Sequence, residues 1–158
     1  MSTRSGQRAQ RLQRIARIGD TLASVAESAA AERRRALSAE QERLETVQRY
    51  LGDYGALVQQ RESAGSGVAS LRLYRNFSGW LADLSQNQTN EVAQAEFLLE
   101  AALEEVREKR GFADALEHAA DRANAVARRE REAEQQKTLD ELAQRIRGGS
   151  LASKLQNP

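Results

Sequence analysis

One short segment rich in glycine and serine interrupts a chain whose apolar residues otherwise recur in a helical pattern. The segment, "RESAGSGVAS", covers residues 61–70, and the only proline is the last residue of the chain. Glycine adopts the backbone angles that a chain reversal needs, and Ser66 or Ser70 is suited to cap a second helix. We therefore predict two helices joined by one loop. The expected bounds are about 8–62 for the first helix, 63–68 for the loop and about 69–147 for the second helix.

The composition favours an all-α fold. Charged residues make up 30% of the chain and aromatic residues 4%, and most of the apolar residues are alanine and leucine. Such a mixture promotes helix and supplies too few large side chains for a thick globular core. We expect a long antiparallel two-helix coiled-coil hairpin over residues 1–147, in which the longer second helix extends past the start of the first. A disordered tail is expected at 148–158.

Three series of apolar residues have the alternating steps of three and four that are typical of the seam between two coiled-coil helices. The segment "AERRRALSAEQE" separates the first series from the second, and Leu37 within it is one residue out of phase with the first. We expect a stutter or a local loosening there. The first series is Ile15, Ile18, Leu22, Val25 and Ala29; the second is Leu44, Val47, Leu51, Tyr54 and Val58; the third is Ala95, Leu99, Ala102, Val106, Lys109, Ala113, Leu116, Ala120, Ala123 and Ala127.

The sequence lacks the patterns of the common catalytic and metal sites. It has no GxxxxGK[ST] phosphate loop, no nucleophile elbow and no cysteine, and its one histidine, His118, has no partner for a metal site. We therefore expect no enzyme activity, no metal and no cofactor, and a function in binding other proteins. The net charge of +1 gives no reason to expect nucleic acid as a partner. No apolar run suits a membrane span and the N-terminus lacks the apolar stretch of a secretory signal, so the expected compartment is the cytoplasm.

Arginine dominates the first 20 residues, where five arginines and one aspartate give a local excess of four positive charges. Their spacing of three or four residues predicts that they line one side of a helix. We interpret this surface first as a solvated face and second as a site for an acidic protein. Nucleic acid ranks third, because the chain has no nucleic-acid-binding motif and this segment has no interleaved aromatic residues. The arginines are Arg4, Arg8, Arg11, Arg14 and Arg17.

Five of the seven aromatic residues lie between residues 50 and 80, on both sides of the predicted turn. A hairpin with this loop sets Tyr54 opposite Phe77 and Tyr50 opposite Leu81. Four residues on each helix form a stripe with steps of four, three and four. We call these eight residues the aromatic band. They are Arg43, Val47, Tyr50 and Tyr54 on the first helix and Phe77, Leu81, Leu84 and Gln88 on the second.

The aromatic band is wider than the seam of two helices, which needs only heptad positions a and d. A two-helix protein should therefore expose part of it, and an exposed aromatic patch usually marks a partner site. The alternatives are burial by a third helix or by a homodimer, or a hydrophobic clasp that closes the tip. We expect Trp80 to be a packing residue beside the band. Gly52, Gly55 and Gly79 predict either a pliable tip or a close approach of the backbone beneath the rings.

Four motifs of the chain resemble the FliJ/YscO family of type III export proteins. They are "RLETVQRYLGDYGALV", the glycine loop "GSGVAS", "LYRNFSGWLADL" and the closing "QQKTLDELAQR", and the similarity runs from about residue 10 to residue 147. The tyrosines four residues apart, the short loop and the Tyr-x-x-Phe start of the second helix are the specific parts. The resemblance implies an antiparallel coiled coil similar to the central stalk subunit of rotary ATPases.

The resemblance also implies a function. A flagellar member is a non-enzymatic component of the type III export apparatus, at the cytoplasmic face of the inner membrane. Its expected partners are the export ATPase FliI, whose hexamer it promotes, the export gate FlhA and the export chaperones that it escorts. The gate-contacting surface of the family maps to the eight residues of the aromatic band. By analogy with the stalk, Arg8, Arg11, Arg14 and Arg17 are expected to meet acidic groups in the ATPase ring.

Two other functions fit the same residues. A YscO-like stalk protein of an injectisome shares the resemblance. A generic structural coiled coil or holdase chaperone would use the aromatic residues of the tip to clasp unfolded clients. Broad binding to denatured proteins without stimulation of an ATPase would indicate the holdase.

Overall fold

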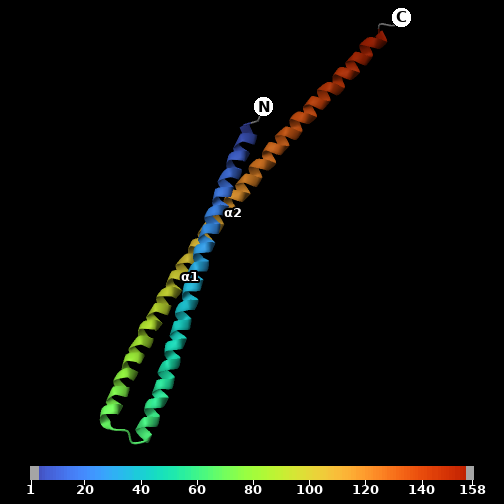
Figure 1. Ribbon diagram of the computed structural model, residues 1–158. Coiled ribbons are helices and arrows are strands. Elements are labelled where there is room, and N and C mark those ends of the chain that lie inside the picture. The colour runs from blue at the N-terminus through green and yellow to red at the C-terminus, as the bar shows by residue number, and fades with distance from the viewer. Residues whose placement is uncertain (1–3, 156–158) are drawn as a thin grey trace. The chain divides into compact units, whose positions relative to one another are not determined.

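The computed structural model describes residues 4–155, which form two α-helices and one loop. Helix α1 covers Arg4–Ser63 and helix α2 covers Val68–Leu155, and no strand occurs among the described residues (Figure 1). The two long helices pack against each other, so the predicted all-α helical hairpin is confirmed.

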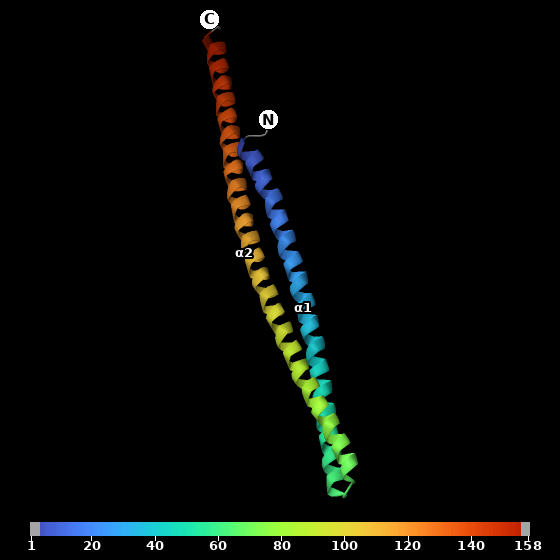
Figure 2. The same cartoon turned by 90° about the vertical axis from the view of Figure 1, so that its left-hand side faces the viewer.

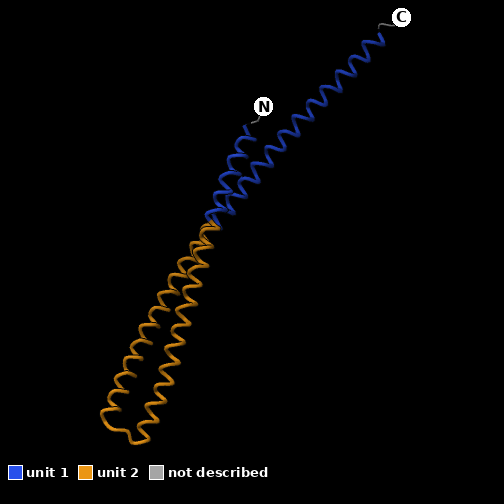
Figure 3. The backbone as a smooth tube through the Cα atoms, viewed as in Figure 1, with its two compact units in different colours: residues 1–22, 110–158 blue, residues 23–109 orange. Residues whose placement is uncertain are grey.

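The chain divides into two compact units, which Figure 3 colours separately. Unit 1 contains Met1–Leu22 and Arg110–Pro158, and unit 2 contains Ala23–Lys109 with the loop. Within each unit the segments of α1 and α2 lie side by side, both in Figure 1 and in the perpendicular view of Figure 2. Each unit is therefore an antiparallel helix pair.

The helices are longer than the sequence pattern suggests. α1 begins at Arg4, and α2 continues to Leu155, so the disordered tail expected from residue 148 is helical over its described part. Residues 156–158 of that tail lie outside the described residues. Gly148 and Gly149 disfavour helix by about 1 kcal/mol each relative to alanine. The alanine, lysine and leucines that follow them are good helix formers, and they offset Ser150 and Ser153 of the same stretch.

The loop that joins the helices occupies residues 64–67 and has the hydrogen bonds of a Schellman motif. The Ser66 amide donates to the Arg61 carbonyl at 3.2 Å, and the Gly65 amide donates to the Glu62 carbonyl at 3.2 Å. Gly65 has a φ of 75°, a left-handed conformation that glycine adopts without a Cβ clash. Across the loop, Arg75 Nη2 lies 2.8 Å from Glu62 Oε1. The glycine-rich segment therefore makes the predicted reversal and caps the C-terminal end of α1. α2 begins at Val68, and neither Ser66 nor Ser70, the predicted caps, donates or accepts a side-chain hydrogen bond there with another described residue.

The predicted seam is confirmed for the second and third series and is wrong by one residue for the first. Every residue of the second and third series is buried or half-buried. In the first series Ile15 is 43% exposed, Ile18 60%, Leu22 42% and Val25 62%. The buried residues of this part of α1 are instead small. Five of them each directly follow a residue of the first series, and the sixth, Ala9, lies seven residues before Ala16. The five are Ala16, Gly19, Ala23, Ala26 and Ala30.

The small residues keep their heptad phase as far as Leu44, although the seam position between Ala30 and Leu37 is the exposed Arg33, which fits the predicted local loosening. The step from Ala30 to Leu37 is seven residues, and the step from Leu37 to Leu44 is seven again. Leu37 is half-buried and in phase with the residues on both sides of it, so the expected stutter is absent. The large apolar residues of the first series and the small residues one position later both follow the steps of three and four. Packing against the small seam residues of α2 places the small residues in the seam.

The two helices of unit 1 approach each other closely at Gly19. A Cβ at this position would lie 3.0 Å from Cδ1 of Leu116 and 3.3 Å from Cα of Ala113. Such distances leave no room for a side chain, because contacts below about 3.4 Å are already repulsive. The alanines at Ala113, Ala120 and Ala127 allow this approach, and each is at most 4% exposed.

The end of α2 has no partner helix. All described residues after Ala127 are exposed, including the apolar Leu139, Leu142 and Ile146. The described part of α2 therefore outruns that of α1, as predicted.

The glycines of the tip do not lie beneath other atoms. A Cβ added at Gly52, Gly55 or Gly79 would meet no other group within 4 Å, so close backbone approach does not explain them. Replacing Gly52 with alanine should stabilise the protein by about 0.5–1 kcal/mol, because alanine favours helix and meets no neighbour. Thermal unfolding followed by circular dichroism at the helix band would show a higher midpoint. A lower midpoint would mean that Gly52 has a packing role.

Candidate protein-binding site

The aromatic band forms an apolar groove in unit 2. Ten residues line a groove of about 550 Å³ between α1 and α2. They include Val47, Tyr50, Tyr54, Phe77, Leu81 and Leu84, which are six of the eight residues predicted for the band. Because a short loop fixes the register of the two helices, the two sequence stripes meet at the same height.

The rings of the groove are in direct contact. The centroids of Tyr54 and Phe77 are 4.6 Å apart with an interplanar angle of 62°, which is an edge-to-face arrangement. Tyr74 extends the cluster on the other side of Tyr54 at 5.9 Å, and Trp80 lies 5.5 Å from Phe77. Aromatic pairs of this geometry contribute about 0.5–1.5 kcal/mol beyond the area they bury. The cluster therefore holds the walls of the groove in place.

The band divides into a buried floor and exposed walls. Leu81 is 6% exposed and belongs to the core, whereas Tyr50 is 62% exposed and Phe77 42%. Val47, Tyr54 and Leu84 are half-buried. The expectation that two helices cannot cover the whole band is therefore confirmed, and Tyr50 and Phe77 offer the largest free apolar surface.

Two further residues of the groove differ from the sequence prediction. Trp80, expected to pack beside the band, is 56% exposed and lines the groove. Leu57 also lines it and is exposed, although it was outside the predicted stripe. The sequence spacing does place both residues beside the band. Leu57 is seven residues after Tyr50 and Trp80 is three after Phe77, so each continues a stripe.

The polar members of the band lie in a neighbouring groove. Arg43 and Gln88 line a second depression that shares Thr46 and Val47 with the first. Gln88 Nε2 donates to the Glu40 carboxylate at 2.6 Å and to its backbone carbonyl at 3.1 Å. Arg43 Nη1 donates to the other oxygen of that carboxylate at 2.5 Å. Both side chains thus bind Glu40. Gln88 is half-buried and makes a contact across the seam, whereas the Arg43 side chain stays 66% exposed beside Glu40 on the same helix.

The basic residues near the start of α1 do not share one side of the helix. At about 100° per residue, Arg17 lies about 120° around the helix from Arg11. Arg8 and Arg11 flank one side of the seam, whereas Arg14 and Arg17 point elsewhere. Three-residue steps cause this drift, because only alternating steps of three and four keep residues aligned.

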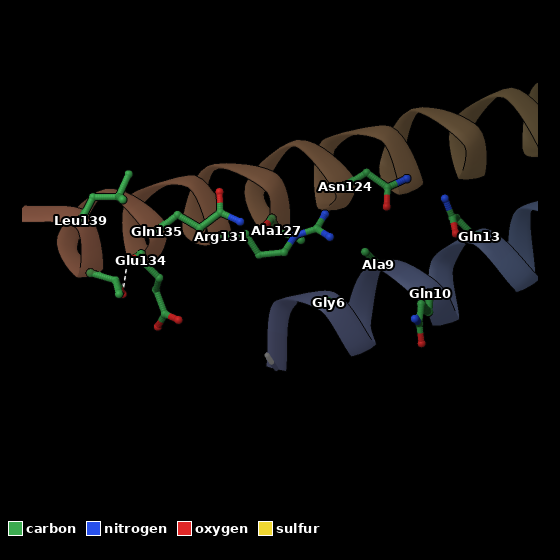
Figure 4. A pocket seen from close by; sticks show the side chains of 11 residues that line it. Gly6, Ala9, Gln10, Gln13, Asn124, Ala127, Arg131, Glu134, Gln135 and Leu139 are labelled. Carbon is green, nitrogen blue, oxygen red and sulfur yellow. Dashed lines mark hydrogen bonds between the residues drawn. The ribbon is translucent and has the colours of Figure 1, made fainter. Parts of the chain in front are cut away.

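A groove of about 930 Å³ in unit 1 contains none of the predicted site residues (Figure 4). Ala9 and Ala127 lie between the helices at its centre, and amide and charged side chains surround them. Arg131 Nε donates to the Ala127 carbonyl at 3.2 Å, so this side chain is folded back on its own helix. The groove is polar on its rim and is the place where α2 continues past α1.

The described residues contain no group of three or more His, Cys, Asp or Glu side chains placed to hold a metal ion. His118 is exposed on α2, as expected for a surface residue. No helix within 4–155 is long and apolar enough for a bilayer span.

Comparison with known proteins relates the chain to one family. A family model described as "Flagellar FliJ protein" matches residues 7–150. Neither a curated protein nor a solved structure matches the chain. The matched segment covers both helices and the loop, including every residue of the aromatic band. The family is a flagellar, non-catalytic one that is related to export. The chain therefore belongs to the FliJ family of flagellar proteins.

Proposed function

We propose that this protein is a non-enzymatic coupler of the flagellar type III export apparatus. In this proposal it works at the cytoplasmic face of the inner membrane, binds the export ATPase FliI, contacts the export gate FlhA and escorts substrate chaperones. The membership of the FliJ family supports the flagellar role. The groove of the aromatic band is the observation that carries the gate contact, because it presents Tyr50, Phe77 and Trp80 to solvent at the loop end of unit 2.

The experiment that tests the coupler is co-purification with the flagellar ATPase of the same cell, followed by assays of ring formation and ATP hydrolysis. We expect the protein to promote the ring and to raise the rate of hydrolysis. Broad binding of denatured proteins with no effect on the ATPase would instead identify a holdase, and stimulation only of an injectisome ATPase would identify a YscO-like stalk.

The ring contact is assigned to the arginines near the start of α1. Reversing Arg8, Arg11, Arg14 and Arg17 to glutamate should weaken ring assembly and ATPase stimulation at low salt, where charge attraction is least screened. The matched control reverses four exposed arginines of unit 2, Arg33, Arg34, Arg35 and Arg49, and should change stimulation little. Unchanged stimulation in the first variant would remove these arginines from the ring contact.

A further inference from the structure

One side of unit 1 carries only arginine and apolar residues. Counting Ala9 and Ala113 as heptad position a, the paired segments 4–22 and 112–129 contain twelve positions c and g. In an antiparallel pair the g positions of both helices lie on the same side of the seam, and the c positions border them. We call these twelve residues the c/g face. Five of them are arginines: Arg4, Arg8, Arg11, Arg122 and Arg129.

The other seven residues of the c/g face are apolar. Ile15, Ile18, Leu22, Phe112 and Val126 are all exposed, and two alanines lie among them. Ile15, Ile18 and Leu22 are the residues that follow a seam rhythm yet lie outside the seam. A helix that repeats the three-four rhythm beside its first seam has a second apolar stripe, which a further helix can cover.

A groove on this side confirms that the two helices contribute jointly. Arg4 and Arg8 of α1 and Arg122 of α2 line it, together with the half-buried Leu12 and Ala119. Glu130 is the one carboxylate of the groove, and it accepts a hydrogen bond from the Ser5 hydroxyl. The groove thus has a recessed apolar floor and a rim on which positive charge prevails.

The opposite side of unit 1 is different in kind. Positions b and e of the same segments hold no large apolar residue. Their charges are mixed, because Arg17 and Arg128 are accompanied by Asp20, Asp114 and Asp121. None of the five arginines of the c/g face forms an ion pair with another described residue. The positive charge of unit 1 is therefore concentrated on the side that also exposes its apolar residues.

We propose that the c/g face of unit 1 binds an acidic amphipathic α-helix of a partner protein, which packs along the two helices as a third helix. The apolar side of the partner covers Ile15, Leu22 and Phe112, and its carboxylates meet the arginines. Recognition of an amphipathic helix by an apolar groove uses anchors at this spacing. The proposal does not rest on the proposed function. It assigns a surface separate from the aromatic band, and it shares Arg8 and Arg11 with the arginines assigned to the ATPase ring.

Two other occupants fit the face less well. A second copy related by twofold symmetry would bring the same five arginines against each other, and like charges across an interface are costly. A flat bilayer would meet the projecting arginines before it reached the floor formed by Leu12 and Ala119. A helix is narrow enough to lie between them. The paired part of α1 has 19 described residues, so the matching helix is about 28 Å, or about 20 residues, long.

The test uses two labelled synthetic helices of about 20 residues with leucine at positions a and d. One carries glutamate at the flanking positions and the other carries lysine. Fluorescence anisotropy with the full-length protein should show that the acidic peptide binds at least about tenfold more tightly than the basic one. Its affinity should fall as salt is raised, because the contact is partly ionic.

Substitutions on this face should remove the binding without unfolding the protein, since the altered side chains are exposed. Ile18→Glu with Leu22→Glu should weaken the acidic peptide by about tenfold or more, as loss of central apolar anchors does. Gln10→Glu with Gln13→Glu is the matched control, because it adds the same charge to α1 on the opposite side. Arg122→Ala with Arg129→Ala should reduce the salt dependence, and these arginines are not among those assigned to the ATPase ring.

Three results would overturn the proposal. Equal binding of the acidic and basic peptides would show that charge does not select the partner. Binding of vesicles that contain anionic phosphatidylglycerol, with no binding of the acidic peptide, would identify a lipid surface. A dimer in analytical ultracentrifugation that Leu22→Glu dissociates would identify a second copy as the occupant.

Discussion

Replacing Tyr50 and Phe77 together with alanine is expected to abolish binding to the export gate while leaving the protein helical and folded. Tyr50 is 62% exposed and Phe77 42%, so neither belongs to the buried core. The loss of stability is limited to the ring contacts of Phe77 with Tyr54 and Trp80. Buried aromatic anchors in an interface commonly contribute about 2 kcal/mol or more each, which for two residues is a loss of affinity of about a thousandfold. Calorimetric titration with the cytoplasmic part of the gate protein measures this loss.

The control for this prediction is Phe97→Ala. Phe97 is another exposed aromatic residue of unit 2, but it lies outside the groove. It should leave gate affinity unchanged. A double variant with normal affinity would show that the gate binds elsewhere, and a large fall in its melting temperature would show that the band is mainly structural. Leu81→Ala should behave in that second way, because Leu81 belongs to the core.

Gly19→Leu is expected to destabilise unit 1 strongly. The new side chain would collide with Leu116 and with the backbone of Ala113, whose atoms lie 3.0 Å and 3.3 Å from a Cβ at this position. Forcing extra atoms into a packed contact costs about 1–3 kcal/mol, which exceeds the gain of less than about 1 kcal/mol from the better helix propensity of leucine. Thermal unfolding should show a midpoint lower by several degrees, since each kcal/mol shifts it by about 2–4 °C in a chain of this size.

Gly111→Leu provides the comparison for Gly19→Leu. Gly111 lies in α2 within the same unit, and a Cβ there meets nothing within 4 Å. The same substitution should therefore be neutral or stabilising at residue 111. Equal midpoints for the two variants would mean that the helices of unit 1 are not held together at Gly19.

The hairpin and its groove could be predicted because local signals determine them. The glycine loop sets the register, and the register then brings the Tyr50 stripe and the Phe77 stripe to the same height. Which side chains of the groove are buried depends on packing, so the exposure of Trp80 was not readable from spacing. Gln88 was likewise indistinguishable from a surface residue, because its bond to Glu40 crosses 48 positions of sequence.

The seam of α1 differs from the sequence prediction for a physical reason. Large apolar residues are the usual signal of a core, and Ile15, Ile18 and Leu22 follow the heptad rhythm as well as the alanines beside them do. Steps of seven residues back from Leu44 through Leu37 reach Ala30 and the other small residues, so these residues lie in the seam instead. The isoleucines are thereby left outside the seam, and an apolar stripe in that position needs a partner other than α2.

Alanine seams determine longitudinal alignment only weakly. A run of methyl groups presents nearly the same profile after a displacement of seven residues, so shape alone offers little resistance to sliding. In unit 1 the asymmetry comes from Leu116, which lies against Gly19. Displacing the helices by one heptad in one direction would set Leu116 against Leu12, where two large side chains compete for one space. The contact of Leu116 with Gly19 therefore adds a preference for one longitudinal alignment of the two helices in unit 1.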